Sequence, residues 1–312
     1  MRHFINMLII MSFILFFTAC QSDDQADSGE KGSEDIVTVE HELGETDVPK
    51  NPEKVIVFDF GMLDTLDYLN IPVVGVPQMN IPQYLEKYTS DDYENIGSLK
   101  EPDFEKIANI DPDLIIISGR QSELYDELKK LGPVIYLGID NERYFESFKE
   151  NVKVIGEIFS KEDEIEQALA EIDAQIASIK EEAETINKNS LIILANDDKI
   201  SAYGENSRFG IIHDVFGIAP VDINIEASTH GMNVSFEYVA QQNPDLLYVI
   251  DRSAAIGEEP AAKNIVENEL MKSTTVMQND TIYYLNPDVW YLSGGGIISI
   301  QKMIEEIELS LQ

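Results

Sequence analysis

Cysteine is almost absent from this chain of 312 residues, which contains only Cys20, together with four histidines. A single thiol excludes an internal disulfide, a four-thiolate zinc site and a cysteine-bound cluster. Positive charge is also scarce, because 22 Lys and Arg stand against 58 Asp and Glu, for a formal net charge of −36. Nucleic acids are bound through clustered cations that displace counterions, so we exclude nucleic acid as a partner.

The familiar signatures of catalysis are missing as well. The sequence contains no G-x-S-x-G elbow, no HExxH and no pairing of Cys with His, so no nucleophile or hydrolytic metal site is visible. The triple glycine 294–296 is not followed by Gly-Lys-Ser/Thr, which excludes a phosphate loop and favours close entry of the chain into its last helix. Four histidines are too few for a site that binds a bare transition metal. We therefore expect a protein that is not an enzyme and has no intrinsic cofactor.

The first residues have the pattern of a processing signal. A basic start at Arg2 precedes an apolar run from Phe4 to Phe17, which is shorter than the ~20 residues that span a membrane. The run ends in Thr18-Ala19-Cys20, which resembles the lipobox of bacterial lipoproteins, where cleavage leaves a lipidated cysteine. We predict a signal peptide at 1–19, lipidation at Cys20 and a polar tether over 20–35, with a plain signal peptide as the alternative. The protein is then expected on the outer face of the cell membrane.

The rest of the chain alternates short β-branched runs with helical segments. Between Val55 and Leu137 the runs are VIVFD, VVGV, LIIIS and VIYL, and the same pattern resumes at LIILAN from Leu191. Apolar strands separated by helices indicate parallel sheets covered on both faces. We therefore predict the α/β class with two Rossmann-like lobes.

An internal repeat supports the two lobes. FEKIANIDPDLIIISGR at 104–120 matches FEYVAQQNPDLLYVIDR at 236–252 without a gap. Each copy predicts a short helix, a buried strand and an arginine at the carboxyl end of the strand, the edge where open α/β sheets bind ligands.

One long helix is predicted between the lobes. The segment 162–187 has apolar residues at alternating spacings of four and three, which draws a single stripe on a continuous helix of about 39 Å. The expected organisation is an N-terminal lobe at 36–161, this connecting helix at 162–187 and a C-terminal lobe at 188–312. A continuous helix resists bending, so we expect only a small change in the angle between the lobes on binding.

Arginine is used sparingly, in five positions against 17 lysines. Arg120, Arg208 and Arg252 each follow a predicted strand, and a guanidinium group is preferred where a planar fork must meet an oxyanion. The alternative is that each one pairs with a nearby carboxylate; Arg143 keeps that interpretation. Three cations in one cleft make sense with a ligand of matching charge, such as a ferric tris-catecholate with a net charge of −3.

Other residues near these loops could complete a site. His230 lies in a polar loop and Tyr291 follows a strand, and both side chains can bind ferric iron where a chelator leaves positions open, although either could be an ordinary loop or core residue. The only tryptophan, Trp290, could flank a planar ligand or pack in the core. Glu105 and Glu237 hold matching places at the starts of the repeated helices, where they could cap the helix or dock a partner that spans both lobes.

Taken together, these motifs resemble a known family. The lipobox, the paired FExxxxxxPDL units, the connecting helix and the run GENSRFGIIHDVFG, followed by THG, DR and WYLSGG, are similar to the siderophore-binding lipoproteins of bacterial ABC importers, in particular the catecholate branch that takes petrobactin and enterobactin. The resemblance covers nearly all of the chain after the tether. It implies the fold of class III substrate-binding proteins, with the ligand between two lobes.

The resemblance also implies roles for individual residues. Arg120, Arg208 and Arg252 would surround the catecholate oxygens, and His230 and Tyr291 would bind the iron of incomplete chelators. Glu105 and Glu237 would form salt bridges with the permease. Four residues are expected to line the ligand: Gly119, Gln121, Tyr203 and Trp290.

We therefore expect a lipid-anchored, monomeric receptor that captures a ferric siderophore and delivers it to an ABC permease and its ATPase. The alternatives are the same scaffold binding haem, vitamin B12 or another chelate such as a hydroxamate, and a surface enzyme that acts on the chelate.

Overall fold

The computed structural model describes residues 35–312. The predicted signal peptide, Cys20 and nearly all of the predicted tether lie outside the described residues. A β-hairpin of β1 (Ile36–His41) and β2 (Gly44–Pro49) precedes the first sheet. We call residues 35–161 the N-terminal half and residues 188–312 the C-terminal half.

The N-terminal half contains a five-stranded sheet in the order β5-β4-β3-β6-β7, and every pair of neighbouring strands is parallel. Its strands are β3 (Val55–Val57), β4 (Gly75–Val76), β5 (Glu94–Asn95), β6 (Leu114–Ile117) and β7 (Val134–Tyr136). Its helices are α1 (Phe60–Tyr68), η1 (Gln83–Thr89), α2 (Phe104–Ile110), η2 (Gly119–Leu124), α3 (Tyr125–Leu128), η3 (Asn141–Arg143) and α4 (Tyr144–Phe159). The predicted parallel α/β arrangement is confirmed for this half.

The C-terminal half contains a six-stranded sheet in the order β11-β9-β8-β12-β13, with β10 also paired to β8. Its strands are β8 (Asn189–Asn196), β9 (Lys199–Tyr203), β10 (Ala219–Pro220), β11 (Met232–Val234), β12 (Leu246–Asp251) and β13 (Ile282–Leu285). Its helices are α6 (Ile211–Asp214), α7 (Phe236–Gln242), α8 (Arg252–Ala255), α9 (Ala262–Val266), η4 (Met271–Ser273), α10 (Thr275–Gln278), the π-helix η5 (Asp288–Ser293) and α11 (Ile297–Leu311).

One edge of this second sheet differs from the prediction. The strand β9 runs antiparallel to β8, and β11 runs antiparallel to β9, so the sheet is mixed. Only Asp197 and Asp198 separate β8 from β9, and Asp197 adopts a left-handed backbone with φ of 54°. A two-residue connection can join only antiparallel strands, because a parallel return needs a longer crossover.

The internal repeat forms the same substructure twice. The helices α2 and α7 are capped by the side chains of Asp103 and Ser235, and both end in a left-handed residue, Asp111 or Asn243. The strands that follow, β6 and β12, each lie between two parallel neighbours. The carboxyl ends of both strands therefore open onto the ligand-binding edge of their sheets.

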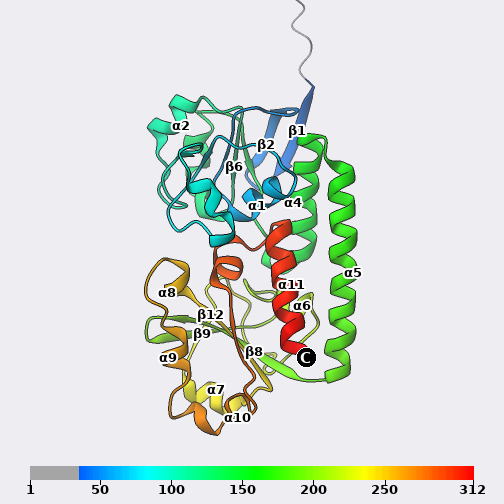
Figure 1. Ribbon diagram of the computed structural model, residues 1–312, viewed down its shortest axis with the longest axis vertical. Helices are drawn as coiled ribbons and strands as arrows, with labels where there is room; N and C mark the ends of the chain where they lie inside the picture. Colours follow the sequence, from blue (N-terminus) through cyan, green and yellow to red (C-terminus); the bar gives the residue numbers. More distant parts are fainter. Residues whose placement is uncertain (1–34) are drawn as a thin grey trace, which may run out of the picture. The chain divides into compact units, whose positions relative to one another are not determined.

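Between the two halves runs α5 (Glu162–Ile186), a single helix over almost the whole predicted range. Its predicted stripe is buried from Ile165 to Ala183, and α5 packs against both α4 and α11. Figure 1 shows α5 alongside α11.

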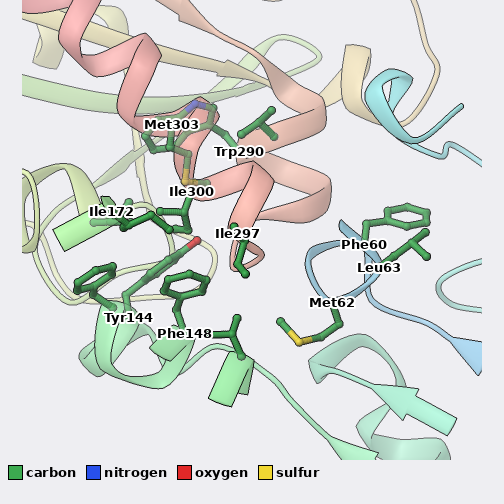
Figure 2. Packing of buried hydrophobic residues seen from close by; sticks show 14 of the residues in the cluster. Phe60, Met62, Leu63, Tyr144, Phe148, Ile172, Trp290, Ile297, Ile300 and Met303 are labelled. Carbon is green, nitrogen blue, oxygen red and sulfur yellow. The ribbon is translucent and has the colours of Figure 1, made fainter. Parts of the chain in front are cut away.

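The C-terminal helix α11 departs from the predicted division into lobes. It follows the C-terminal sheet in sequence, yet it packs on α1 of the N-terminal half as well as on α5. One hydrophobic cluster consequently includes residues of both halves, such as Phe60 and Leu63 of α1 and Ile297 and Ile300 of α11 (Figure 2). No helix within residues 35–312 combines the length and apolar character that a membrane crossing requires.

Candidate functional site

The three arginines singled out in the sequence come from three different connections. Arg120 lies in η2, which follows β6, and Arg252 is the first residue of α8, directly after β12. Arg208 lies in the loop between β9 and α6. All three residues are partly buried. We refer to them as the arginine cluster.

The arginine cluster converges on Tyr291 of η5. The Nη2 atoms of Arg120 and Arg208 both donate to the backbone carbonyl of Tyr291, at 2.9 and 2.7 Å. The Nε of Arg252 donates to the Tyr291 phenol oxygen at 3.2 Å, and the Arg208 guanidinium lies 4.2 Å from the centre of the Tyr291 ring. The structure thus brings arginines from both halves around one residue.

The cluster keeps its positive charge without a carboxylate in contact. Among residues 35–312, the ion pairs include none with these three arginines, whereas Arg143 pairs with Glu150 as expected. Burial lowers the pKa of Arg120, and the nearby Arg208 lowers this pKa further. Within residues 35–312 no carboxylate therefore lies at ion-pair distance from the three arginines, although the nearby Asp59 acts to raise the pKa of Arg120.

The charge of the cluster acts on the Tyr291 phenol. Burial of this phenol acts to raise its pKa, but the cationic Arg208 and Arg252 outweigh burial and hold the pKa below its ordinary value. The two guanidinium groups therefore favour the phenolate form of this side chain, the form in which a tyrosine can bind a metal ion.

Two polar residues at the same sheet edges were missed in the sequence. Asn196, the last residue of β8, accepts a hydrogen bond at 2.9 Å from Nη1 of Arg252 through its side-chain oxygen. Asp59, just beyond β3, caps α1 and lies near Arg120; burial raises the pKa of its carboxyl group, while Arg120 acts against that rise. Asn196 ends a central strand and Asp59 comes shortly after another, at the edge where open α/β sheets place ligands, and this position was the signal that the sequence offered.

His230 lies in the loop before β11 and is exposed. The Asn141 side chain of the N-terminal half donates to the hydroxyl of the neighbouring Thr229 at 3.4 Å, so this loop contacts both halves. Within residues 35–312 the structure records no group of three or more His, Cys, Asp and Glu residues arranged to hold a metal ion. His230 and Tyr291 therefore stay predicted iron ligands that depend on donors from the chelator.

Three of the four predicted lining residues are buried in the structure. Gln121 is 0% exposed, because its side chain bonds to the Leu99 carbonyl and the Ser118 amide. Trp290 is 3% exposed and donates from its indole nitrogen to Glu306 at 2.9 Å; Figure 2 shows it among buried side chains with Ile300 and Met303.

Tyr203 is 1% exposed and packs edge-on against Phe209, with ring centres 4.7 Å apart. These three side chains belong to the core beneath the cluster, so they support its loops and present no accessible surface to a ligand. Gly119 is exposed beside Arg120, and its lining role stays a prediction.

The two glutamates expected to dock a partner occupy equivalent exposed positions. Glu105 lies in the first turn of α2 and Glu237 in the first turn of α7. The side chains that cap these helices are those of Asp103 and Ser235, so capping does not require either glutamate. Neither forms an ion pair with another residue in the described part of the chain.

Known proteins resemble this chain in both sequence and structure. The petrobactin-binding protein YclQ of Bacillus subtilis is 50% identical over the whole of both chains. Its crystal structure superposes with a TM-score of 0.88, covering 89% of this chain and 99% of that one at 54% identity. The catecholate-siderophore binding protein VctP of Vibrio cholerae is 34% identical, with a TM-score of 0.83 over 88% of this chain and 100% of its own.

The expected fold class and family resemblance are both confirmed by these likenesses. Residues 57–289 match the periplasmic binding protein family, a range that includes most of both sheets and the arginine cluster. The chain belongs to the periplasmic binding protein family.

Proposed function

We propose that this protein binds a ferric catecholate siderophore of the petrobactin type at the arginine cluster and delivers it to an ABC permease for iron uptake. The observation that carries the proposal is the convergence of Arg120, Arg208 and Arg252 around Tyr291 without a carboxylate in contact. The likeness to YclQ and VctP, whose names state petrobactin and catecholate siderophores, supports the same ligand class.

Charge explains why such a ligand suits this site. Three guanidinium groups repel one another, so an anion that lies among them relieves that repulsion. At 4 Å and an effective dielectric constant near 20, each opposite charge contributes about 4 kcal/mol before the cost of desolvation. A neutral ferric hydroxamate gains none of this attraction, whereas a tris-catecholate complex carries three negative charges.

Tyr291 and His230 would complete the coordination of iron when a chelator supplies only four donors. Arg208 and Arg252 hold the pKa of the Tyr291 phenol below its ordinary value, which favours the phenolate that would bind ferric iron. His230, on an exposed loop, would approach as the ligand settles. A chelator with six donors would need neither residue.

Delivery would use the two exposed glutamates. Glu105 and Glu237 lie on structurally equivalent helices of the two halves, so a permease that spans both could pair one cationic side chain with each. Lipidation of Cys20 and the polar tether would hold the protein at the membrane surface beside that permease.

The test is titration of the protein with ferric petrobactin and with a ferric hydroxamate, followed through quenching of the single tryptophan. We expect tight binding of the catecholate complex and little binding of the neutral chelate. Replacing all three arginines of the cluster by glutamine should weaken catecholate binding by roughly a thousandfold or more, given the size of each charge interaction. Preserved affinity in this variant would contradict the proposal.

The matched control is Arg143→Gln. Arg143 is the remaining arginine of the described residues, and it pairs with Glu150 on the surface of the N-terminal half. It carries the same charge as the cluster residues, so the control separates a specific site from the general effect of lost positive charge. We expect its affinity to stay within twofold of the unsubstituted protein, because exposed ion pairs contribute little.

A further inference from the structure

A buried carboxylate joins the two halves of the molecule away from the arginine cluster. Asp64 of α1 is 0% exposed, and no lysine or arginine pairs with it among the residues that the structure describes. Its Oδ1 accepts from the amide of Ile298 at 3.1 Å, and its Oδ2 accepts from the amide of Ser299 at 3.0 Å. The Tyr84 hydroxyl also donates to Oδ2, at 3.0 Å.

These bonds satisfy the first amides of a helix that has no side-chain cap of its own at Gly296. The first amides of any helix lack partners within that helix, and a residue just before it normally supplies one. Here the acceptors come from α1, more than 230 positions earlier in the chain. Besides the two oxygens of Asp64, the hydroxyl of the neighbouring Thr65 accepts from the amide of Ile297 at 3.2 Å. The N-terminal half therefore fixes the beginning of α11.

The segment fixed in this way carries Tyr291. It begins at Asp288, whose Oδ2 accepts from the amide of Gln83 at 2.8 Å, and it continues through η5 into the first turn of α11. The N-terminal half thus forms hydrogen bonds with both ends of the segment 288–299. Between these two ends, the Tyr291 carbonyl accepts the hydrogen bonds of Arg120 and Arg208.

The glycines at this contact allow the backbones to approach closely. A Cβ atom on Gly296 would overlap the Gly61 carbonyl and Oδ1 of Asp64, and one on Gly61 would come within 2.8 Å of the Ser293 carbonyl. The two helix starts therefore meet backbone to backbone, so a change in the acceptor at Asp64 would be transmitted directly to the segment that carries Tyr291.

We propose that Asp64 is a positioning residue, which fixes segment 288–299 to the N-terminal half and so sets the place of Tyr291 between arginines of both halves. Asp64 itself has no surface through which it could touch a ligand. The effect on affinity rests on the proposed function, whereas the effect on the position of the segment does not.

The test compares Asp64→Asn with Asp67→Asn in the absence of ligand. Asn keeps the shape of Asp64 but replaces one acceptor oxygen with a donor that faces an amide hydrogen. Asp67 lies on the same helix and bonds to Lys87 and to the Tyr88 hydroxyl of η1, and within residues 35–312 it makes no hydrogen bond to α11. Hydrogen exchange followed by mass spectrometry then reports on peptides that cover residues 288–299.

We expect Asp64→Asn to speed exchange of the amides of Ile297, Ile298 and Ser299 by roughly tenfold, the scale of a lost hydrogen bond. The emission of the nearby Trp290 should shift to longer wavelength in the same variant. Asp67→Asn should leave both signals unchanged. A purely stabilising role would lower the melting temperature without a local change in exchange, and that outcome would overturn the proposal.

A second variant covers the case in which Asp64→Asn does not fold. Tyr84→Phe removes one of the three donors to Asp64 and leaves the carboxylate in place. We expect a smaller increase in exchange over the same peptide, roughly threefold, and unchanged exchange there would again overturn the proposal.

The affinity measurement separates the two proposals. Asp64→Asn should weaken binding of ferric petrobactin by roughly tenfold, and Asp67→Asn should leave it within twofold of the unsubstituted protein. If the unsubstituted protein fails to bind ferric catecholates, the proposed function fails, while hydrogen exchange still decides the role of Asp64. If affinity is unchanged although exchange rises, Tyr291 is not positioned through Asp64 and this inference fails alone.

Discussion

At the scale of single residues, Tyr291 offers a test that distinguishes iron coordination from simple packing. Tyr291→Phe removes the phenol oxygen that accepts from Arg252 and leaves the carbonyl that accepts from Arg120 and Arg208. We expect affinity for a ferric complex with two catecholates to fall by roughly tenfold or more, and affinity for a complex with three to change little. Tryptophan quenching with both complexes gives the two affinities.

The control for this comparison is Tyr284→Phe, which removes a phenol that is exposed and bonds only to Glu267. It should change neither affinity. An equal loss for both complexes in Tyr291→Phe would show that the phenol acts through packing or charge and does not bind iron.

Asp64 leads to a prediction on pH. Burial raises the pKa of its carboxyl to about 7, against an opposing effect from its hydrogen bonds with Ser299 and Tyr84. The folded protein therefore holds this proton more tightly than the unfolded chain, whose carboxyl titrates near pH ~4. The stability that this proton contributes is present below pH ~4 and is lost as the pH rises through about 7.

The expected size of this effect is up to about 4 kcal/mol in the free energy of unfolding, at 1.36 kcal/mol for each unit of pKa difference. The asparagine of Asp64→Asn does not titrate. The free energy of unfolding of the unsubstituted protein should therefore fall, relative to that of Asp64→Asn, as the pH rises from 4 to 8. Denaturant unfolding at both pH values measures it. The ionisable groups that interact with Asp64 are Tyr84 of η1 and Tyr144 of α4; Asp59 before α1 acts on the same two tyrosines, and Lys302 of α11 lies over the Tyr84 ring. A constant difference across this range would contradict the prediction.

At the scale of helices and strands, the contact between α1 and α11 depends on Gly296. We expect Gly296→Ala to lower the free energy of unfolding by about 3 kcal/mol or more, because the added methyl group overlaps backbone and a carboxylate that cannot move aside. Gly119→Ala is the matched control, since its Cβ would meet only the Tyr136 hydroxyl at 3.7 Å. Thermal or denaturant unfolding compares the two, and equal stabilities would show that the helices separate without cost.

Most elements could be predicted from the sequence because their signals are local. The stripe on α5, the repeated helix and strand units, and the arginines after the strands all follow from spacing within a few residues. The packing of α11 on α1 could not be predicted, because it joins residues more than 230 positions apart. The close approach of the two backbones requires a glycine at position 296, and a single glycine in a sequence does not indicate its distant partner.

The burial of Trp290 could not be predicted for a similar reason. Its partner, Glu306, lies on the next helix, and no local pattern indicates that the indole nitrogen turns towards it. The places of Arg120 and Arg252 were the more predictable part of the site, since each follows a strand with parallel neighbours and so lies at the carboxyl edge of its sheet. Arg208 follows the antiparallel strand β9, so its approach to the other two does not follow from that rule.

At the scale of the whole molecule, the formal net charge of −36 opposes the approach of an anionic chelate. Long-range repulsion between exposed charges is screened by salt, whereas contacts inside the partly buried cluster are screened less. We therefore expect the association rate constant for ferric petrobactin to rise roughly threefold between 10 and 150 mM salt. Stopped-flow quenching measures it, with a nonionic solute of equal osmolality as the control; a falling rate would indicate attractive steering.

The place of α11 also has a consequence for how this protein acquires its structure. A chain made from its N-terminus presents α1 long before α11 exists, so the apolar face formed by Phe60 and Leu63 stays uncovered until α11 has been made. The first half can form its parallel strands early, but part of its hydrophobic interior is covered only when α11 packs on α1. A chain that has not yet acquired α11 is therefore expected to be more vulnerable to aggregation and proteolysis than one in which α11 is in place.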